Sequence, residues 1–441
     1  MNQRLSVKRT CVNRWLAYSD PTGMSAPTRP RTRGDRPRLA LVLSGGGARG
    51  AYEAGVMRYI REDLAGDLGG QVQFDIICGT SVGAIHACFF AATADIAPLQ
   101  GRILVDRWES FVLEEMVSFG VKEFMRAPAT ILGSGHIEEV EGQRHLGGIV
   151  QTQQLERVVR RLIPWHKIES NIQEGKLESL SVTATDIGSG KTVVFLQSAR
   201  PQAPGWSKDP FVRAQRVTIG AEHALASAAL PILFPAICVG ERFFCDGGLR
   251  QNTPLSPALR LGADKVLVIG LRQQPPVTNA VPEESMPFPG AAFLVGKILD
   301  AFLLDHIDYD LDRLRRFNAV IEAVRATGSP DHVARFDQVV TTMRGAPYRI
   351  VGEYMLRPSG DLGEIAGQVA RSGRFKGSGG GPGIQLLRRL ATARGADEAD
   401  LLSYILFDGL YAAEVARMGY DDARAHHDEL AKFLADAVVR E

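Results

Sequence analysis

An α/β fold, in which a mainly parallel central sheet lies between two layers of helices, is the fold class that the sequence predicts. The run Leu39–Leu43 is apolar and free of charge, as a strand buried on both faces should be. Lys265–Gly270 has the same apolar character after its first residue. Between these runs, candidate strands alternate with stretches of helical length, which is typical of a parallel sheet joined by crossover helices.

The elements expected up to Leu271 are short apolar runs separated by glycine and proline. Gly188-Ser189-Gly190 marks the turn of one strand pair, and Pro231 ends a helix. The expected strands are Leu39–Leu43, Phe74–Cys78, Leu180–Asp186, Thr192–Leu196, Ile237–Val239, Arg242–Cys245 and Lys265–Gly270, and the expected helices are Ala51–Leu64, one after Gly83, and Ala224–Leu230.

The chain changes character after Leu271. Further elements are a proline-rich connector at Pro275–Pro289, a long helical region at Ala291–Ala326, a strand at Tyr348–Leu356, a mobile glycine-rich loop at Ser372–Pro382, and helices over residues 383–440. We therefore expect three parts: a disordered basic tail over residues 1–37, an α/β domain over 38–271, and a mostly helical extension over 272–441 packed on that domain.

Composition excludes several classes of protein. The formal net charge of the 441 residues is +1, so no overall field favours nucleic acid as a partner. The five cysteines form no Cys-x-x-Cys pair, which disfavours zinc and a disulfide framework and suits a reducing compartment. We see no signal peptide, and the apolar stretches Ile76–Ala94 and Ala224–Gly240 are interrupted by polar residues or prolines. A cytoplasmic protein is expected, with peripheral contact to a membrane.

A serine in a tight turn is the first candidate for chemistry. Gly79-Thr80-Ser81-Val82-Gly83 stands between a buried strand and a helix, which is the context of a nucleophile elbow. The turn strains its serine, and the flanking residues must be glycines because side chains there would strike the neighbouring strand and helix. The dipole of the following helix favours an anion that develops at Ser81. The alternative is a glycine-rich loop with a capping serine.

A glycine run after the first strand is the second candidate. Gly45, Gly46, Gly47, Ala48, Arg49 and Gly50 expose backbone amides that can converge on one anionic oxygen, as in an oxyanion hole. The run also fits the G-x-G-x-x-G pattern of a dinucleotide-binding loop. That alternative requires an acidic residue at the end of the second strand, where this chain has Cys78-Gly79 instead.

The third candidate is Asp246-Gly247-Gly248, directly after a strand. A carboxylate at a strand end, followed by two glycines, can approach another part of the backbone closely. Taken alone, the tripeptide is equally a plain turn.

Together, the three motifs and their order resemble the patatin-like phospholipase family, in its bacterial branch. Two segments near Asp246 resemble it too, Ala228–Pro235 before the aspartate and Asn252-Thr253-Pro254 after it, as does Val182–Asp186 farther upstream. The resemblance is strong over about Leu39–Leu271 and weaker beyond. Many members have aspartate before the glycine run, where this chain has Ser44.

The resemblance implies a Ser-Asp dyad in which Ser81 is the nucleophile and Asp246 its base, with the glycine run as oxyanion hole. Histidine gives an independent check, because a triad of the α/β-hydrolase type places its histidine after the aspartate. His306, His332, His426 and His427 follow Asp246 but lie in charged, helix-like surroundings, and His86 has the context of a core residue. His136 and His223 could line a pocket, but neither lies in a motif.

The function expected is that of a serine acyl hydrolase that cleaves carboxylic ester bonds of lipids or phospholipids and releases fatty acid. Neither a cofactor nor a metal is expected, and the partner is a lipid ester. Two alternatives remain open at this point: a catalytically silent regulatory protein on the same fold, and a nucleotide-binding α/β protein.

Overall fold

The structure is a computed structural model that describes residues 36–116, 118–119, 137–140, 143–146, 150–200, 210–231, 233–273, 307–344, 347–374 and 402–439. The basic tail up to Asp35, the proline-rich connector, Ala291–His306 and most of the glycine-rich loop lie outside the described residues.

Five strands side by side form the parallel half of the central sheet. β1 (Leu39–Leu43) lies between β13 (Lys265–Ile269) and β3 (Ile76–Thr80), and both pair with it in parallel. Outside these, β8 (Ser179–Asp186) pairs with β3 and β14 (Gly352–Leu356) pairs with β13, again in parallel. β1 and β3 are fully buried, and β13 is buried after Lys265, which explains why these stretches lack charge.

The other half of the sheet is antiparallel. From β8 the order continues through β12 (Arg242–Asp246), β11 (Ala236–Val239), β6 (Gln143–Leu146) and β5 (Ile137–Val140). Beside this path, β9 (Lys191–Ser198) returns antiparallel on β8 and takes β10 (Val212–Arg216) as a parallel neighbour. Two short pairs join β2 (Gln71–Val72) to β15 (Val438–Val439) and β4 (Ser118–Phe119) to β7 (Val150–Gln151).

Alternate residues of β1 define the two faces of the sheet. Leu39, Leu41 and Leu43 belong to a core cluster shared with α1 (Ala51–Tyr59), α3 (Val82–Ala92), α4 (Gln100–Glu109) and α17 (Gly409–Ala425). Ala40 and Val42 belong to a second cluster, shared with α10 (Leu255–Leu261) and α12 (Ile307–Thr327). The sheet is thus covered on both faces, as the sequence predicts.

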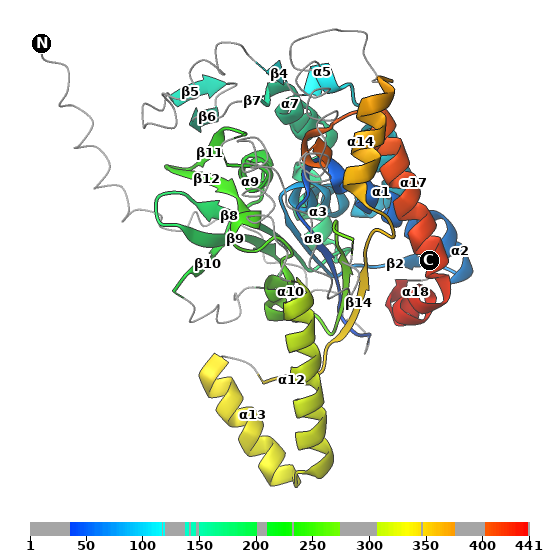
Figure 1. Cartoon of the computed structure of the whole chain (residues 1–441). Coiled ribbons are helices and arrows are strands. Elements are labelled where there is room, and N and C mark those ends of the chain that lie inside the picture. The colour runs from blue at the N-terminus through cyan, green and yellow to red at the C-terminus, as the bar shows by residue number, and fades with distance from the viewer. Residues whose placement is uncertain are drawn as a thin grey trace, which may run out of the picture. The chain divides into compact units, whose positions relative to one another are not determined.

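The remaining helices that bear on this account are short or peripheral. They are α7 (Gln153–Leu162), α8 (His166–Gln173), α9 (Ala221–Ser227), α13 (Pro330–Arg344), α14 (Leu362–Ser372) and α18 (His427–Leu434), with α2 (Ala65–Asp67) and α5 (Leu113–Met116) of a single turn. In Figure 1, α12 and α13 form a pair that extends away from the sheet. Among the described helices, none alone is long and apolar enough to cross a membrane. The pair Val82–Ala92 and Ala94–Glu109 reaches that length and composition only when the two helices are taken together, and they are bent by 115° relative to each other.

Several expected elements begin or end at other residues. The strand expected at Tyr348–Leu356 is β14, which begins only at Gly352. Two further differences have a local reason. β3 starts at Ile76, two residues after the expected Phe74, because the carboxylate of Asp75 accepts the Leu39 amide and ties the strand start to β1. The helix expected at Ala224–Leu230 is α9, which already ends at Ser227. The carbonyl of Ala229 instead accepts the amide of Asp246, 2.8 Å away.

The closest helix contact joins α1, which follows the glycine run, to α17 near the C-terminus. A Cβ atom on Gly55 would lie 1.8 Å from the carbonyl oxygen of Ala416, and one on Gly419 would lie 2.2 Å from that of Tyr52. The hydroxyl of Tyr52 donates to Asp422 across the same interface, at 3.0 Å. Two helices that are far apart in the chain therefore pack backbone against backbone, and only glycine fits there.

Replacing Gly55 by alanine should lower the free energy of unfolding by about 1–3 kcal/mol, because the methyl group forces α1 and α17 apart. The matched control is Gly66→Ala in α2, where a Cβ would meet nothing within 4 Å. There the same substitution should raise the free energy of unfolding by about 0.5–1 kcal/mol, because alanine leaves the unfolded chain fewer conformations than glycine does. Urea unfolding of both variants measures this, and equal effects would contradict the helix contact.

Candidate active site

Ser81 stands between β3 and α3 in a strained backbone conformation. Its φ is 56° and its ψ −127°, and no other non-glycine residue in the described ranges has a positive φ. A Cβ on Gly79 would lie 2.1 Å from the carbonyl oxygen of Gly83, and one on Gly83 would lie 2.5 Å from that of Leu43. Both predicted elbow glycines are thus required by close backbone contacts, as the sequence argument states.

The backbone of Ser81 is held by a side chain that sequence reasoning missed. The Ser81 amide donates to the hydroxyl of Ser227 at 2.9 Å, and that hydroxyl donates to the carbonyl of Thr183 at 2.6 Å. Ser227 is the last residue of α9, so this chain of bonds links three elements around the elbow. The apolar neighbours of Ser227 indicate burial, but its hydrogen-bond partners are distant in the chain and could not be predicted from its local sequence.

The glycine run lies beside the elbow and is pinned at its first residue. A Cβ on Gly45 would lie 3.0 Å from the Cβ of Ser81. The amide of Gly45 donates to the backbone carbonyl of Asn252 at 3.1 Å, and the side-chain amide of Asn252 donates back to Gly45 at 3.1 Å. Ser44, which replaces the family's frequent aspartate, shares a 2.6 Å hydrogen bond with the hydroxyl of Thr253.

The backbone amides of the run divide into two groups. Those of Gly45 and Arg49 already donate within the protein, to Asn252 and to the carbonyl of Gly46. A Cβ on Gly50 would lie 2.5 Å from the side chain of Val82, so this glycine serves close packing. The amides of Gly46, Gly47 and Ala48 have no acceptor in the described part of the chain and start the 3-10 turn Gly47–Gly50. The six predicted residues thus reduce to three available amides.

Asp246 ends β12 and is fully buried. The amide of Gly248 donates to its Oδ1 at 2.7 Å, and the hydroxyl of Thr185 donates to its main-chain carbonyl at 3.0 Å. A Cβ on Gly247 would lie 2.2 Å from the carbonyl oxygen of Thr183. The predicted turn glycines therefore let β12 end against β8, where Asp246 reaches the elbow.

The carboxyl of Asp246 is poised between its protonated and ionised forms. Desolvation by burial raises its pKa to about 7, while the nearby Ser81 hydroxyl and the Gly248 amide lower it. Oδ2 makes no hydrogen bond of full geometry with any described atom. The influence of the Ser81 hydroxyl on this pKa means that the two side chains are neighbours.

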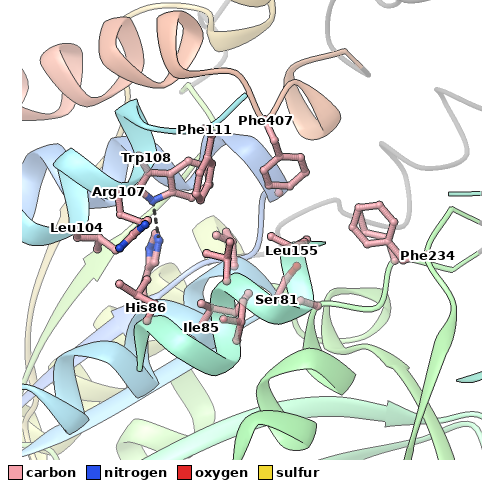
Figure 2. A pocket seen from close by; sticks show the side chains of 17 residues that line it. Ser81, Ile85, His86, Leu104, Arg107, Trp108, Phe111, Leu155, Phe234 and Phe407 are labelled. Atoms are coloured by element: carbon pink, nitrogen blue, oxygen red, sulfur yellow. Dashed lines mark hydrogen bonds between the residues drawn. The ribbon is translucent and has the colours of Figure 1, made fainter. Parts of the chain in front are cut away.

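An apolar pocket opens directly beside Ser81 (Figure 2). The empty space between its walls, including the part open to solvent, is about 590 Å³. Figure 2 shows Phe234 and Leu104 toward opposite ends of the lining, with Ser81 closer to Phe234. The lining comes from the glycine run, the elbow helix, α4 and the residues after it, α7, the segment between α9 and β11, and the C-terminal region: Gly47, Ser81, Val82, Ile85, His86, Leu104, Arg107, Trp108, Phe111, Leu155, Val158, Val159, Leu162, Ala228, Leu230, Phe234 and Phe407.

Among the described residues His86 is the histidine that lines this pocket, and both of its ring nitrogens are engaged. The indole N–H of Trp108 donates to Nε2 at 3.0 Å, so Nδ1 carries the hydrogen donated to Glu53 at 2.6 Å. Burial lowers the pKa of His86 to about 3 and raises that of the Glu53 carboxyl well above its usual value. His86 is therefore a neutral core residue, as predicted, and has no free nitrogen to accept a proton from Ser81.

The other predicted histidines lie elsewhere. His223 is buried, accepts the amide of Gly220 at the start of α9 and packs on Phe195, outside the pocket lining. His332, His426 and His427 belong to α13 or to the ends of α17 and α18. His136 and His306 lie outside the described residues.

The described residues fit neither of two other kinds of site, a metal centre and a nucleotide-binding loop. The described residues contain no cluster of three or more His, Cys, Asp or Glu that could hold a metal ion. All residues from Gly45 to Gly50 are buried, and a neighbouring side chain, that of Leu271, lies 2.6 Å from the Cβ position of Gly46. This packing disfavours a dinucleotide phosphate on the run.

The comparisons with known proteins agree with these motifs. Residues 41–259 match the family model described as patatin-like phospholipase. A lysophospholipase NTE1 of Coccidioides immitis is 34% identical over 158 residues, 32% of this chain and 10% of its own length. An uncharacterized NTE family protein of Mycobacterium bovis is 27% identical over 252 residues, 56% of this chain and 53% of its own. The chain thus spans about half of the mycobacterial relative and much less of the fungal one.

Among solved structures, VipD from Legionella pneumophila aligns with 89% of this chain and 67% of its own chain at 12% identity. The TM-score of 0.30 is too low for a comparison of site geometry.

The raised pKa of Asp246 predicts a pH-dependent cost in stability. Its folded pKa of about 7 exceeds the unfolded value of about 3.9, so its contribution is most favourable below pH 4 and is lost as pH rises through 7. Asp246→Asn should therefore raise the free energy of unfolding by about 2–4 kcal/mol at pH 8 and by much less at pH 4.

Chemical unfolding at both pH values measures this difference. Ser81→Ala is the control, because it removes the hydroxyl but keeps the buried carboxyl, and should retain the pH dependence. A gain from Asp246→Asn that is equal at pH 4 and pH 8 would contradict the raised pKa.

Proposed function

The chain belongs to the patatin-like phospholipase family through residues 41–259, and from this premise we propose that it is a serine acyl hydrolase of lipid esters. One observation carries the proposal: a strained serine stands at the wall of an apolar pocket, and its hydroxyl influences the pKa of a fully buried carboxyl behind it. We assign Ser81 as nucleophile, Asp246 as base, and the amides of Gly46, Gly47 and Ala48 as the oxyanion hole.

Asp246 suits the role of base because its pKa of about 7 lies near neutral pH. An aspartate at its ordinary pKa would be a poor acceptor for a hydroxyl proton. The occupied nitrogens of His86 favour a dyad over a triad, because this is the histidine that borders the pocket.

The reaction proceeds in two displacements. Asp246 takes the Ser81 proton while the serine oxygen bonds to the ester carbonyl carbon, and the amides stabilise the resulting oxyanion. The intermediate collapses, the C–O bond of the ester breaks, and Asp246 returns the proton to the leaving alcohol. Water then attacks the acyl-enzyme, gives one proton to Asp246, and the free carboxylic acid leaves as Ser81 regains its proton.

The pocket favours a lipid acyl chain as the group held during this reaction. Its walls beyond Ser81 are aliphatic and aromatic side chains such as Ile85, Leu104 and Phe111. An acyl chain would gain free energy from burial there, at about 25 cal/mol per Å² of apolar area. Some relatives bear the name lysophospholipase, which agrees with a phospholipid or lysophospholipid substrate. We also propose peripheral contact with a membrane, where such substrates reside.

Ser81→Ala and Asp246→Asn should each lower kcat for a p-nitrophenyl ester by at least about 10³-fold, and the double variant by a similar factor, since the pair acts as a unit. A fluorophosphonate should label the protein at Ser81, and mass mapping of the adduct checks the site. Asp361→Asn, at the start of α14 and away from the pocket, is the control that should keep full turnover. Either dyad variant with near-normal turnover would overturn the assignment.

The pH dependence of kcat/KM follows from the protonation state that the base needs. Only ionised Asp246 accepts the serine proton, so the rate should rise with pH and level off, with a midpoint near 7. Initial rates between pH 5 and 9 measure this profile on a neutral ester. A midpoint near 4 would mean that burial does not set the pKa of the base in the working enzyme.

A further inference from the structure

Arg49 lies in the glycine run, yet its side chain is turned into the protein. It is 4% exposed, and its Nε donates to the hydroxyl of Ser403 at 2.7 Å. Its guanidinium carbon lies 3.9 Å from the centre of the Tyr404 ring, which is cation–π geometry. Both partners are more than 350 residues away along the chain. A guanidinium held by a hydroxyl and an aromatic face is already committed to protein partners.

The same C-terminal segment touches the run a second time. Gly47 has a φ of +56°, and a Cβ there would lie 2.2 Å from the carbonyl oxygen of Tyr404. We call residues 402–408 the strap. The strap thus contacts both Gly47, whose amide is available, and Arg49, two residues on.

The far end of the strap is anchored on the pocket wall. Phe407 lines the pocket and stacks on Trp108, with ring centroids 6.1 Å apart and planes 9° apart. Figure 2 shows Phe407 across the pocket from Ile85. The amide of Gly409 donates to the carbonyl of Phe111 at 2.9 Å, and Asp408 caps α17. A strap fixed in this way can hold the run in place.

The run needs such support because its available amides lie between two fixed points. Asn252 pins Gly45 with two hydrogen bonds, but Gly46, Gly47 and Ala48 donate to no described acceptor. Amides of an oxyanion hole must stand within about 0.5 Å of their productive position. The Arg49 contacts with the strap supply the second fixed point, on the other side of these amides.

We propose that Arg49 is a positioning residue for the oxyanion hole, which acts through Ser403 and Tyr404 and does not itself bind the substrate. This inference rests on the proposed function of Ser81 and the amides. It predicts that variants which free the run from the strap lose transition-state stabilisation while ground-state binding is kept.

The test compares Arg49→Gln, Ser403→Ala and Tyr404→Leu in the full-length protein on two substrates. One is a neutral short-chain p-nitrophenyl ester and the other an anionic lysophospholipid. Arg49→Gln and Tyr404→Leu should lower kcat roughly 10- to 100-fold on both substrates, with KM within about 2-fold. The conservative variant Tyr404→Phe keeps the aromatic ring, so its kcat should be much closer to that of the wild-type protein than the kcat of Tyr404→Leu is. Ser403→Ala, which leaves the ring contact, should show a smaller fall in kcat.

Leu410→Ala, just past the strap on an exposed position, is the matched control and should not change kcat. The rate of fluorophosphonate labelling gives a readout without turnover, because the phosphoryl oxygen occupies the same hole, and it should fall in parallel with kcat. Unchanged kcat and labelling in folded Tyr404→Leu and Ser403→Ala would overturn the proposal, even if Arg49→Gln did not fold.

A second result would also overturn the proposal that Arg49 does not bind the substrate. If Arg49→Gln raised KM for the anionic lysophospholipid alone, Arg49 would be a ligand of the headgroup phosphate. Failure of the proposed function has a separate signature. In that case Ser81→Ala would retain hydrolysis, or the wild-type protein would not be labelled at Ser81, whatever the strap variants do.

Discussion

The close approach of backbone to backbone around Ser81 is the constraint on which the rest of the site depends. Gly79 faces Gly83 across the turn, and Gly83 faces the end of β1, with no room for a Cβ at either glycine. This contact holds Ser81 at a positive φ, a conformation that costs about 1–3 kcal/mol and persists only where the surroundings dictate it. Because β1 and β3 are paired central strands, the turn inherits their rigidity and places the serine beside the glycine run that follows β1.

One buried negative charge organises the proposed chemistry. Before reaction the charge resides on Asp246, where burial disfavours it; in the tetrahedral intermediate it resides on the oxyanion, next to three unpaired amides. The total charge of the pocket does not change as the proton moves from Ser81 to Asp246. Desolvation of the carboxylate and the unpaired amides therefore favour the same direction of charge transfer. A charged histidine would add a second ion, and burial of His86 opposes that.

The sequence predicted the parts of the site that are local in the chain. Ser81, Asp246 and the glycines stand in short motifs at strand ends, where a pattern of a few residues determines the backbone. It could not predict Ser227 or the strap as supports, because their partners are distant in the chain. Asn252 lies in a segment that resembles the family, but the sequence does not show which atoms it contacts. It also did not predict which amides of the run are available, since two are used by hydrogen bonds that only the fold creates. The central strands were predicted, but β5, β6 and β10 at the antiparallel edge were not. Nor was α13, whose largely exposed surface gives only a weak apolar period.

The motifs and the family match end by residue 259, yet the structure that supports the site continues to residue 409. β14 extends the parallel sheet beyond β13, α12 covers the face that holds Ala40 and Val42, and α17 packs on the helix that follows the glycine run. Phe407 closes one side of the pocket. The shortest motifs of the chain thus depend on its most distant contacts. A glycine run has no side chains to hold its own shape, so its geometry must come from whatever packs against it, and here much of that packing comes from residues after Leu271.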